Sequence, residues 1–134
     1  MTYDPFLDLA SRPDVVAHWD AAMPERGRWY DRLRVILTRR GLSQVERRCT
    51  LAHELIHAER GDTSCDPRVH REAARRLISV HDLARAVMVY GEDWPRVAED
   101  LWVDDDTLTV RLDSLHPSER GYLLRRLSLK ENTA

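Results

Sequence analysis

The stretch that most constrains the fold is residues 51–57, Leu-Ala-His-Glu-Leu-Ile-His, in which three residues separate two histidines. Helical geometry, at about 100° per residue, places His53 and His57 about 40° apart and one turn along the same face. Two imidazoles in that arrangement can direct their nitrogens at one Zn²⁺ from roughly 2.0–2.1 Å. Glu54 lies on a neighbouring face, where its carboxylate can act as the general base of metal-assisted hydrolysis.

The residues around this motif predict a helix that is buried on two sides. One apolar stripe contains Val45, Cys49, Ala52 and Ile56, and the other contains Leu51, Leu55 and Ala58. Such a double stripe is typical of a helix in the centre of a core. Two histidines and a glutamate in apolar surroundings need polar partners, and a metal ion supplies them.

Local signals predict where this helix begins and ends. Ser43 followed by Glu46 forms a capping box, so the helix starts near residue 44. Gly61 is a suitable residue to close it. Asp66 and Pro67 then open a second helix, with Asp66 as the N-cap and Pro67 at the first helical position.

A zinc site needs a further protein ligand and keeps one position open for water. The second helix is the expected source, because a short connection places it beside the first. Asp66 and His70 lie one turn apart on its predicted inward face. Asp66 is also the expected N-cap, and His70 is also suited to orienting a ligand, so spacing leaves the choice open. A thiolate from Cys65 is a weaker candidate.

For the whole chain we expect an α+β fold: a mainly α-helical, zincin-like domain with a small antiparallel sheet. The three short strands are expected at residues 15–19, 28–30 and 34–37. Helices are expected at residues 81–90, 95–101 and 104–115 and from about 116 to 127, the middle two with the spacing of a helix-turn-helix. Residues 1–90 then form the metal-binding domain, and residues 91–134 form a C-terminal helical extension packed on it.

Size and composition are those of one globular domain. The chain has 134 residues, of which 43% are hydrophobic and 33% charged, with a net charge of −2. It shows neither a signal-peptide pattern nor an apolar run of membrane length, so we expect a cytoplasmic protein without a membrane partner.

Charge disfavours contact with nucleic acid through the helix-turn-helix segment. Its second helix carries Asp104, Asp105, Asp106 and Asp113 against only Arg111. Contacts to phosphate groups require the opposite balance. We therefore interpret the segment as a packing scaffold or a protein-docking surface.

Residues 47–57, Arg-Arg-Cys-Thr-Leu-Ala-His-Glu-Leu-Ile-His, and residues 69–78 resemble the ImmA/IrrE family of metallo-endopeptidases. The chain is most similar to the small versions found in actinobacterial phages and their hosts. The resemblance implies a zinc-dependent peptidase of the gluzincin kind, with two histidines from the motif helix and a glutamate from the next. It also implies a protein substrate, such as a helix-turn-helix repressor of a phage or mobile element.

Two positions depart from the family pattern. The ligand glutamate falls on Asp66, which is one methylene shorter, and the following Asn or Asp falls on His70. On the resemblance, Asp66 is the preferred third zinc ligand and His70 the alternative. These departures keep a second hypothesis open, a catalytically degenerate protein that binds zinc and a protein partner. A DNA-binding regulator is the third.

The predicted reaction is hydrolysis of a peptide bond. Zn²⁺ held by His53, His57 and Asp66, or by His70 in its place, would lower the pKa of a bound water towards about 7. Glu54 would take the proton and pass it to the leaving amine. The strand at residues 34–37 would offer an edge to an extended substrate, and Tyr30 is a weaker candidate for stabilising the oxyanion.

Overall fold

The computed structural model describes residues 2–64 and 66–133, so the weaker ligand candidate Cys65 lies outside the described residues. Within these ranges the chain forms seven helices and one three-stranded sheet, which confirms the predicted α+β class. The elements in chain order are α1 (Pro5–Ala10), β1 (Val16–Ala21), β2 (Gly27–Tyr30), β3 (Val35–Arg39), α2 (Gln44–Arg60), α3 (Pro67–Leu77), α4 (Val80–Tyr90), α5 (Trp94–Leu101), α6 (Asp105–Asp113) and α7 (Pro117–Thr133).

The sheet differs from the prediction in two ways. Its order is β1-β3-β2, with β2 antiparallel to β3 but β1 parallel to it, so the all-antiparallel prediction is wrong. The reason is that β2 and β3 form a hairpin and β1 pairs with the far side of β3. Because β3 is therefore the central strand, the predicted substrate edge at residues 34–37 is also wrong. The free edges of the sheet belong to β1 and β2.

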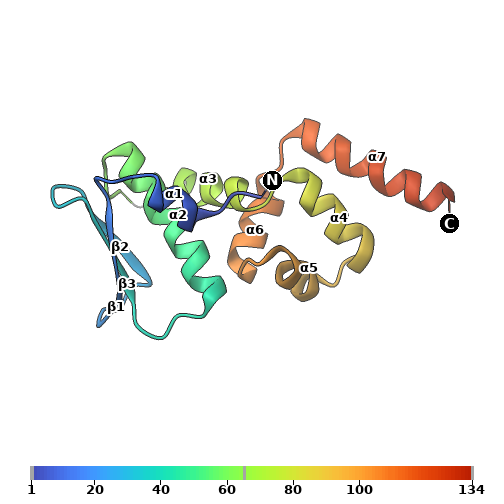
Figure 1. Ribbon diagram of the computed structural model, residues 1–134. Coiled ribbons are helices and arrows are strands. Elements are labelled where there is room, and N and C mark those ends of the chain that lie inside the picture. The colour runs from blue at the N-terminus through green and yellow to red at the C-terminus, as the bar shows by residue number, and fades with distance from the viewer. Residues whose placement is uncertain (1, 65, 134) are drawn as a thin grey trace.

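Helix α2 lies between the sheet and helices α3 to α6 (Figure 1), as its two apolar stripes predict. Leu51, Leu55 and Ala58 pack with buried residues of the sheet, including Trp29 and Ile36. The opposite stripe, Cys49, Ala52 and Ile56, belongs to a second core cluster shared with α3 to α6. The motif helix is thus held from two sides, which fixes the direction in which its polar residues point.

The predicted ends of α2 and the start of α3 are confirmed. Ser43 Oγ accepts from the Glu46 amide at 3.1 Å, and the Glu46 carboxylate accepts from the Ser43 amide at 3.0 Å. Gly61 has a left-handed φ of 69°, and its amide donates to the carbonyl of His57 at 2.9 Å. Asp66 accepts from the amide of Arg68 as the N-cap of α3.

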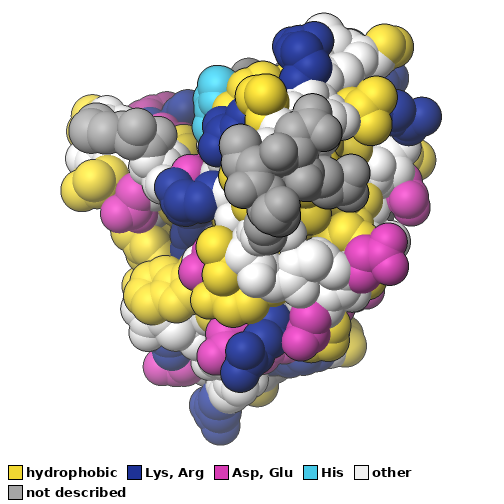
Figure 2. All heavy atoms as spheres, turned by 90° about the vertical axis from the view of Figure 1, so that its right-hand side faces the viewer, with side chains coloured by type: hydrophobic (Ala, Val, Ile, Leu, Met, Phe, Trp, Pro, Cys, Tyr) yellow, Lys and Arg dark blue, Asp and Glu magenta, His cyan; other side chains and the backbone are white. Residues whose placement is uncertain are grey.

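The C-terminal helices share one core cluster with α2 and α3, so side chains on both sides of residue 90 pack together. Arg48 of α2 donates to the carbonyls of Leu101 and Trp102, and thereby caps the end of α5. Figure 2 shows the face at the C-terminal end, where hydrophobic side chains alternate with basic and acidic ones. In the part of the chain that the structure describes, no helix combines the length and apolar character that crossing a membrane requires.

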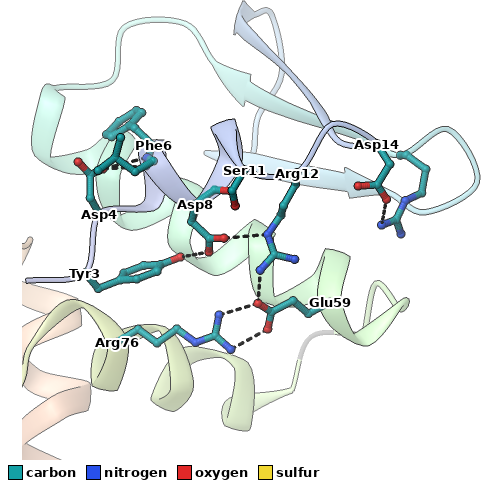
Figure 3. A network of polar contacts seen from close by, with 11 residues as sticks. Tyr3, Asp4, Phe6, Asp8, Ser11, Arg12, Asp14, Glu59 and Arg76 are labelled. Carbon is teal, nitrogen blue, oxygen red and sulfur yellow. Dashed lines mark hydrogen bonds and ion pairs between the residues drawn. The ribbon is translucent and has the colours of Figure 1, made fainter.

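A polar network fixes the relative position of α2 and α3 (Figure 3). Arg76 of α3 donates two hydrogen bonds to Glu59, near the end of α2, at 2.9 and 2.6 Å. Arg12, which follows α1, pairs with the same carboxylate and donates to Asp8 at 2.8 Å. Tyr3 completes the network by donating to Asp8 at 2.6 Å. Because α2 carries His53 and His57 and α3 carries His70, this network bears directly on the geometry of the site.

Candidate metal centre and active site

The two histidines of the motif turn their outer ring nitrogens towards one another. His53 Nε2 and His57 Nε2 lie 3.2 Å apart, with ring centroids at 4.9 Å. Two nitrogens bound to one tetrahedral Zn²⁺ at about 2.05 Å would lie about 3.3 Å apart. The pair therefore already has the separation that two ligands of a shared metal ion need.

The environment keeps His53 in the form that binds a metal. Burial lowers its pKa to about 4, and the neighbouring rings of His70 and His57 act in the same direction. An imidazole must be neutral to donate its nitrogen lone pair to a cation. His53 is therefore neutral at physiological pH before any ion is bound.

Glu54 points from α2 into a pocket of about 270 Å³ that His53 and His70 also line. Its side chain is buried, and burial raises its pKa to about 7. A carboxyl group with a pKa near neutrality can both accept and return a proton. Glu54 thus has the position and the environment of a general base.

Strand β2 approaches α2 closely at this carboxylate. A Cβ atom on Gly27 would lie 2.5 Å from Thr50 Cγ2 and 3.1 Å from Glu54 Cγ. The first distance is far shorter than a van der Waals contact, so only glycine fits here unless the Thr50 side chain or the backbone shifts. Gly27 therefore allows an edge strand to pass directly beside the candidate general base.

The two candidates for the third ligand are placed differently. The His70 ring lies beside that of His53, with centroids 4.5 Å apart, and lines the same pocket as Glu54. The Asp66 carboxylate instead accepts from the amide and the Nε of Arg68, both at 2.9 Å, and from Arg60 at 3.5 Å. Hydrogen bonds to Arg68 hold the pKa of Asp66 well below its usual range. The structure thus brings His70 to the histidine pair and commits Asp66 to capping α3.

Across residues 2–64 and 66–133, no three His, Cys, Asp or Glu side chains are arranged to hold a metal ion as they stand. The donor set is nevertheless suited to zinc, since imidazole nitrogens are among its preferred ligands. His53 and His57 fit such a site in spacing, and the His70 ring lies against that of His53.

Asp62 is a residue of the site that the sequence prediction missed. Its carboxylate lies 3.4 Å from His57 Nδ1, the ring nitrogen opposite the one that faces His53. A carboxylate in this position orients a ligating imidazole and increases its basicity. The only sequence signal is an acidic residue directly after the closing glycine of α2, which is too common to identify it.

Two further results concern the pocket beside Glu54: the predicted Tyr30 does not line it, and residues that were not predicted form one of its walls. Tyr30 is the acceptor of a 3.5 Å contact from Arg28 and is not among the residues lining the pocket of Glu54. One wall of that pocket comes instead from α6 and the residue before it, through Asp104, Asp106, Thr107 and Val110. No local pattern places a helix fifty residues away against the motif, so the sequence did not predict this wall.

Comparison with known protein families gives a match over most of the chain. Residues 11–126 match the family model described as the IrrE N-terminal-like domain, which is a peptidase family. The match covers the sheet, the motif helix, α3 and most of the C-terminal helices. No curated protein and no solved structure matches the chain.

Proposed function

Because the chain belongs to the peptidase family of the IrrE N-terminal-like domain, we propose that it is a zinc-dependent endopeptidase. The observation that carries the proposal is the pair of facing imidazoles, His53 and His57, beside a buried carboxyl group on one helix. His70 is the third ligand in this proposal, since its ring adjoins His53. Asp66, the third ligand that the sequence favoured, stays a prediction, which a metal-binding measurement on an Asp66 variant tests.

When bound, zinc would supply a Lewis acid that polarises the scissile carbonyl and activates water. Glu54 would remove the proton from the attacking water and deliver it to the leaving amine, which the pKa of about 7 permits. Asp62 would hold His57 in the tautomer that directs Nε2 towards the metal. The walls of the pocket shield Glu54 from bulk solvent.

The substrate would bind along β2. This strand is an edge of the sheet, and Gly27 brings it next to Glu54. An extended peptide can add to such an edge through main-chain hydrogen bonds, which position it without a sequence requirement. The scissile bond would then lie between β2 and the histidine pair.

The target would be a regulatory protein, such as a phage or mobile-element repressor, on the basis of family resemblance. We assign no DNA contact to α5 and α6. Arg111, the basic residue of α6, is 1% exposed and donates to the carbonyl of Ile78 at 2.7 Å. The exposed charges of that helix include Asp105, Asp106 and Asp113, which repel phosphate.

The test compares the wild-type protein, loaded with zinc, with Glu54→Gln on a quenched-fluorescent peptide library and on candidate repressors. We expect the wild type to cleave and the variant to lose about 10²–10⁴-fold in kcat/KM, with its zinc retained. Cleavage by Glu54→Gln at the wild-type rate would contradict the general-base role. A wild type that binds zinc and a repressor without cleaving it would support the degenerate alternative.

A further inference from the structure

The pocket beside Glu54 extends well past the candidate metal ligands to the first turns of α6. Its volume of about 270 Å³ is below the roughly 300–1,000 Å³ of typical small-molecule sites. A space of this size, opening next to a proposed peptidase centre, suits one side chain of a bound peptide. The other residues that line the pocket therefore influence which side chain of a substrate it accepts.

Besides its polar residues, the pocket is lined by small and apolar groups. Ala73 and Ala74 of α3 face Val110 and the methyl-bearing Thr107 of α6, and Cys49 contributes from α2. Groups of this kind can accept the methylene groups of a bound side chain. They favour a side chain with a long aliphatic stem.

The two acidic residues in the lining differ in their partners. Asp104 pairs with Arg26 at 2.9 Å and accepts from the amide of Thr107, so its charge is compensated. The side chain of Asp106 has no hydrogen bond or ion pair to another side chain in the described parts of the chain, and it is exposed at the pocket. Arg26 itself is occupied by Asp104 and by Glu46 at 3.0 Å. One carboxylate thus remains available to a cation that enters the pocket.

We propose that this pocket selects a lysine or arginine side chain next to the scissile bond, with Asp106 as the specificity-determining residue. The aliphatic stem would lie between Ala74 and Val110, and the cationic end would reach the Asp106 carboxylate. This inference rests on the proposed peptidase function and names the substrate class of the same site. Because Asp106 is exposed, its charge would contribute a modest preference, about two- to fivefold in kcat/KM.

The test uses quenched-fluorescent octapeptides in which lysine, norleucine or glutamate is fixed at each position in turn. Norleucine keeps the aliphatic stem and lacks the charge, so it isolates the contribution of Asp106. Asp105→Asn is the matched control for Asp106→Asn, since both residues lie in the acidic first turn of α6 and only Asp106 lines the pocket. We expect the wild type and Asp105→Asn to prefer lysine over norleucine at one position, and Asp106→Asn to lose that preference.

Binding of the same peptides to zinc-loaded Glu54→Gln separates this inference from the proposed function. A lysine preference in binding that disappears with the added Asp106→Asn change supports the pocket even if the wild type cleaves nothing. Equal binding and equal cleavage of the lysine and norleucine peptides overturns it, even if the protein is an active peptidase. An equal loss of preference in Asp105→Asn and Asp106→Asn also overturns it.

Discussion

Both ring nitrogens of His57 have a polar neighbour. One of its ring nitrogens faces His53 and the other faces Asp62, which lies in the loop after α2. Its side chain is 5% exposed, so it has little freedom to rotate. Asp62 is also held by Arg60 at 3.4 Å, which fixes the carboxylate from its other side.

We predict that Asp62→Asn weakens zinc binding by about 10–100-fold while the fold is retained, because the ligand loses its orienting carboxylate. Competition with a chromophoric chelator measures the affinity. Glu72→Gln is the control, since it removes the same charge from α3, where Glu72 pairs with Arg76 rather than with a histidine. An unchanged affinity in Asp62→Asn would show that His57 needs no such partner.

Among the residues of the site, the sequence identified those that lie close together along the chain. His53, Glu54 and His57 belong to one helical turn, so their mutual placement follows from the helical period. His70 and Asp62 depend on where the next helix and its loop come to lie, which no spacing determines. The preference for Asp66 as a ligand came from family resemblance, whereas the contacts of its carboxylate with Arg68, two residues further on, are local and agree with the N-cap role that the sequence predicted.

Among the elements, the contact of β2 with α2 is the one that the chemistry most requires. It exists because Gly27 has no side chain where Thr50 and Glu54 approach. The strand then presents its free edge beside the candidate general base.

We expect Gly27→Ala to reduce the free energy of unfolding by about 1–3 kcal/mol, because the added Cβ overpacks against α2. Activity should fall as well, since Glu54 would be displaced. Chemical denaturation and peptide cleavage measure the two effects. The control is Gly121→Ala in α7, where the new Cβ would meet only the flexible end of Arg125 at 3.6 Å and a gain of about 0.5–1 kcal/mol is expected. A Gly27→Ala protein as stable and active as the wild type would contradict the close approach.

The helices were easier to predict than the sheet, for a physical reason. Caps such as Ser43 with Glu46, or Asp66 before Pro67, act within one turn, and they are where the sequence placed them. The pairing of β1 with β3 joins strands separated by β2, and nothing in residues 15–19 encodes the partner. The alternation of side chains indicates a strand but not its neighbours.

At the scale of the whole molecule, Arg111 of α6 connects its own helix with the end of α3 and with α7. It is buried, donates to the carbonyl of Ile78 at the end of α3, and pairs with Glu119 of α7 at 3.0 Å through its second nitrogen. Hydrogen bonding to Arg111 lowers the pKa of Glu119 from its ordinary value of 4.5 to about 2. The ionised carboxylate therefore stabilises the folded protein above pH 4.5, and this contribution is lost as the pH falls towards 2.

We predict that Glu119→Gln destabilises the protein by about 1–3 kcal/mol at neutral pH, since Arg111 would remain buried without its counter-ion. The difference from the wild type should shrink between pH 4.5 and pH 2, as the wild-type carboxylate becomes protonated. Denaturation of the wild type and of Glu119→Gln across that pH range measures this difference in the free energy of unfolding. Glu99→Gln, at an exposed position of α5, should show no such dependence. A difference that stays constant with pH would contradict the role of the ion pair.

The central claim is that one zinc ion is held between α2 and α3 by three imidazoles. Zinc content by mass spectrometry and the ligand set by X-ray absorption, on wild type and single alanine variants, test it most directly. We predict about one zinc ion per chain with three nitrogen ligands in the wild type and in Asp66→Ala, none in His53→Ala or His57→Ala, and weakened binding in His70→Ala. Full zinc content in His53→Ala and His57→Ala would contradict the metal site itself. If Asp66→Ala lost its zinc and His70→Ala kept it, the third ligand would be Asp66 and not His70.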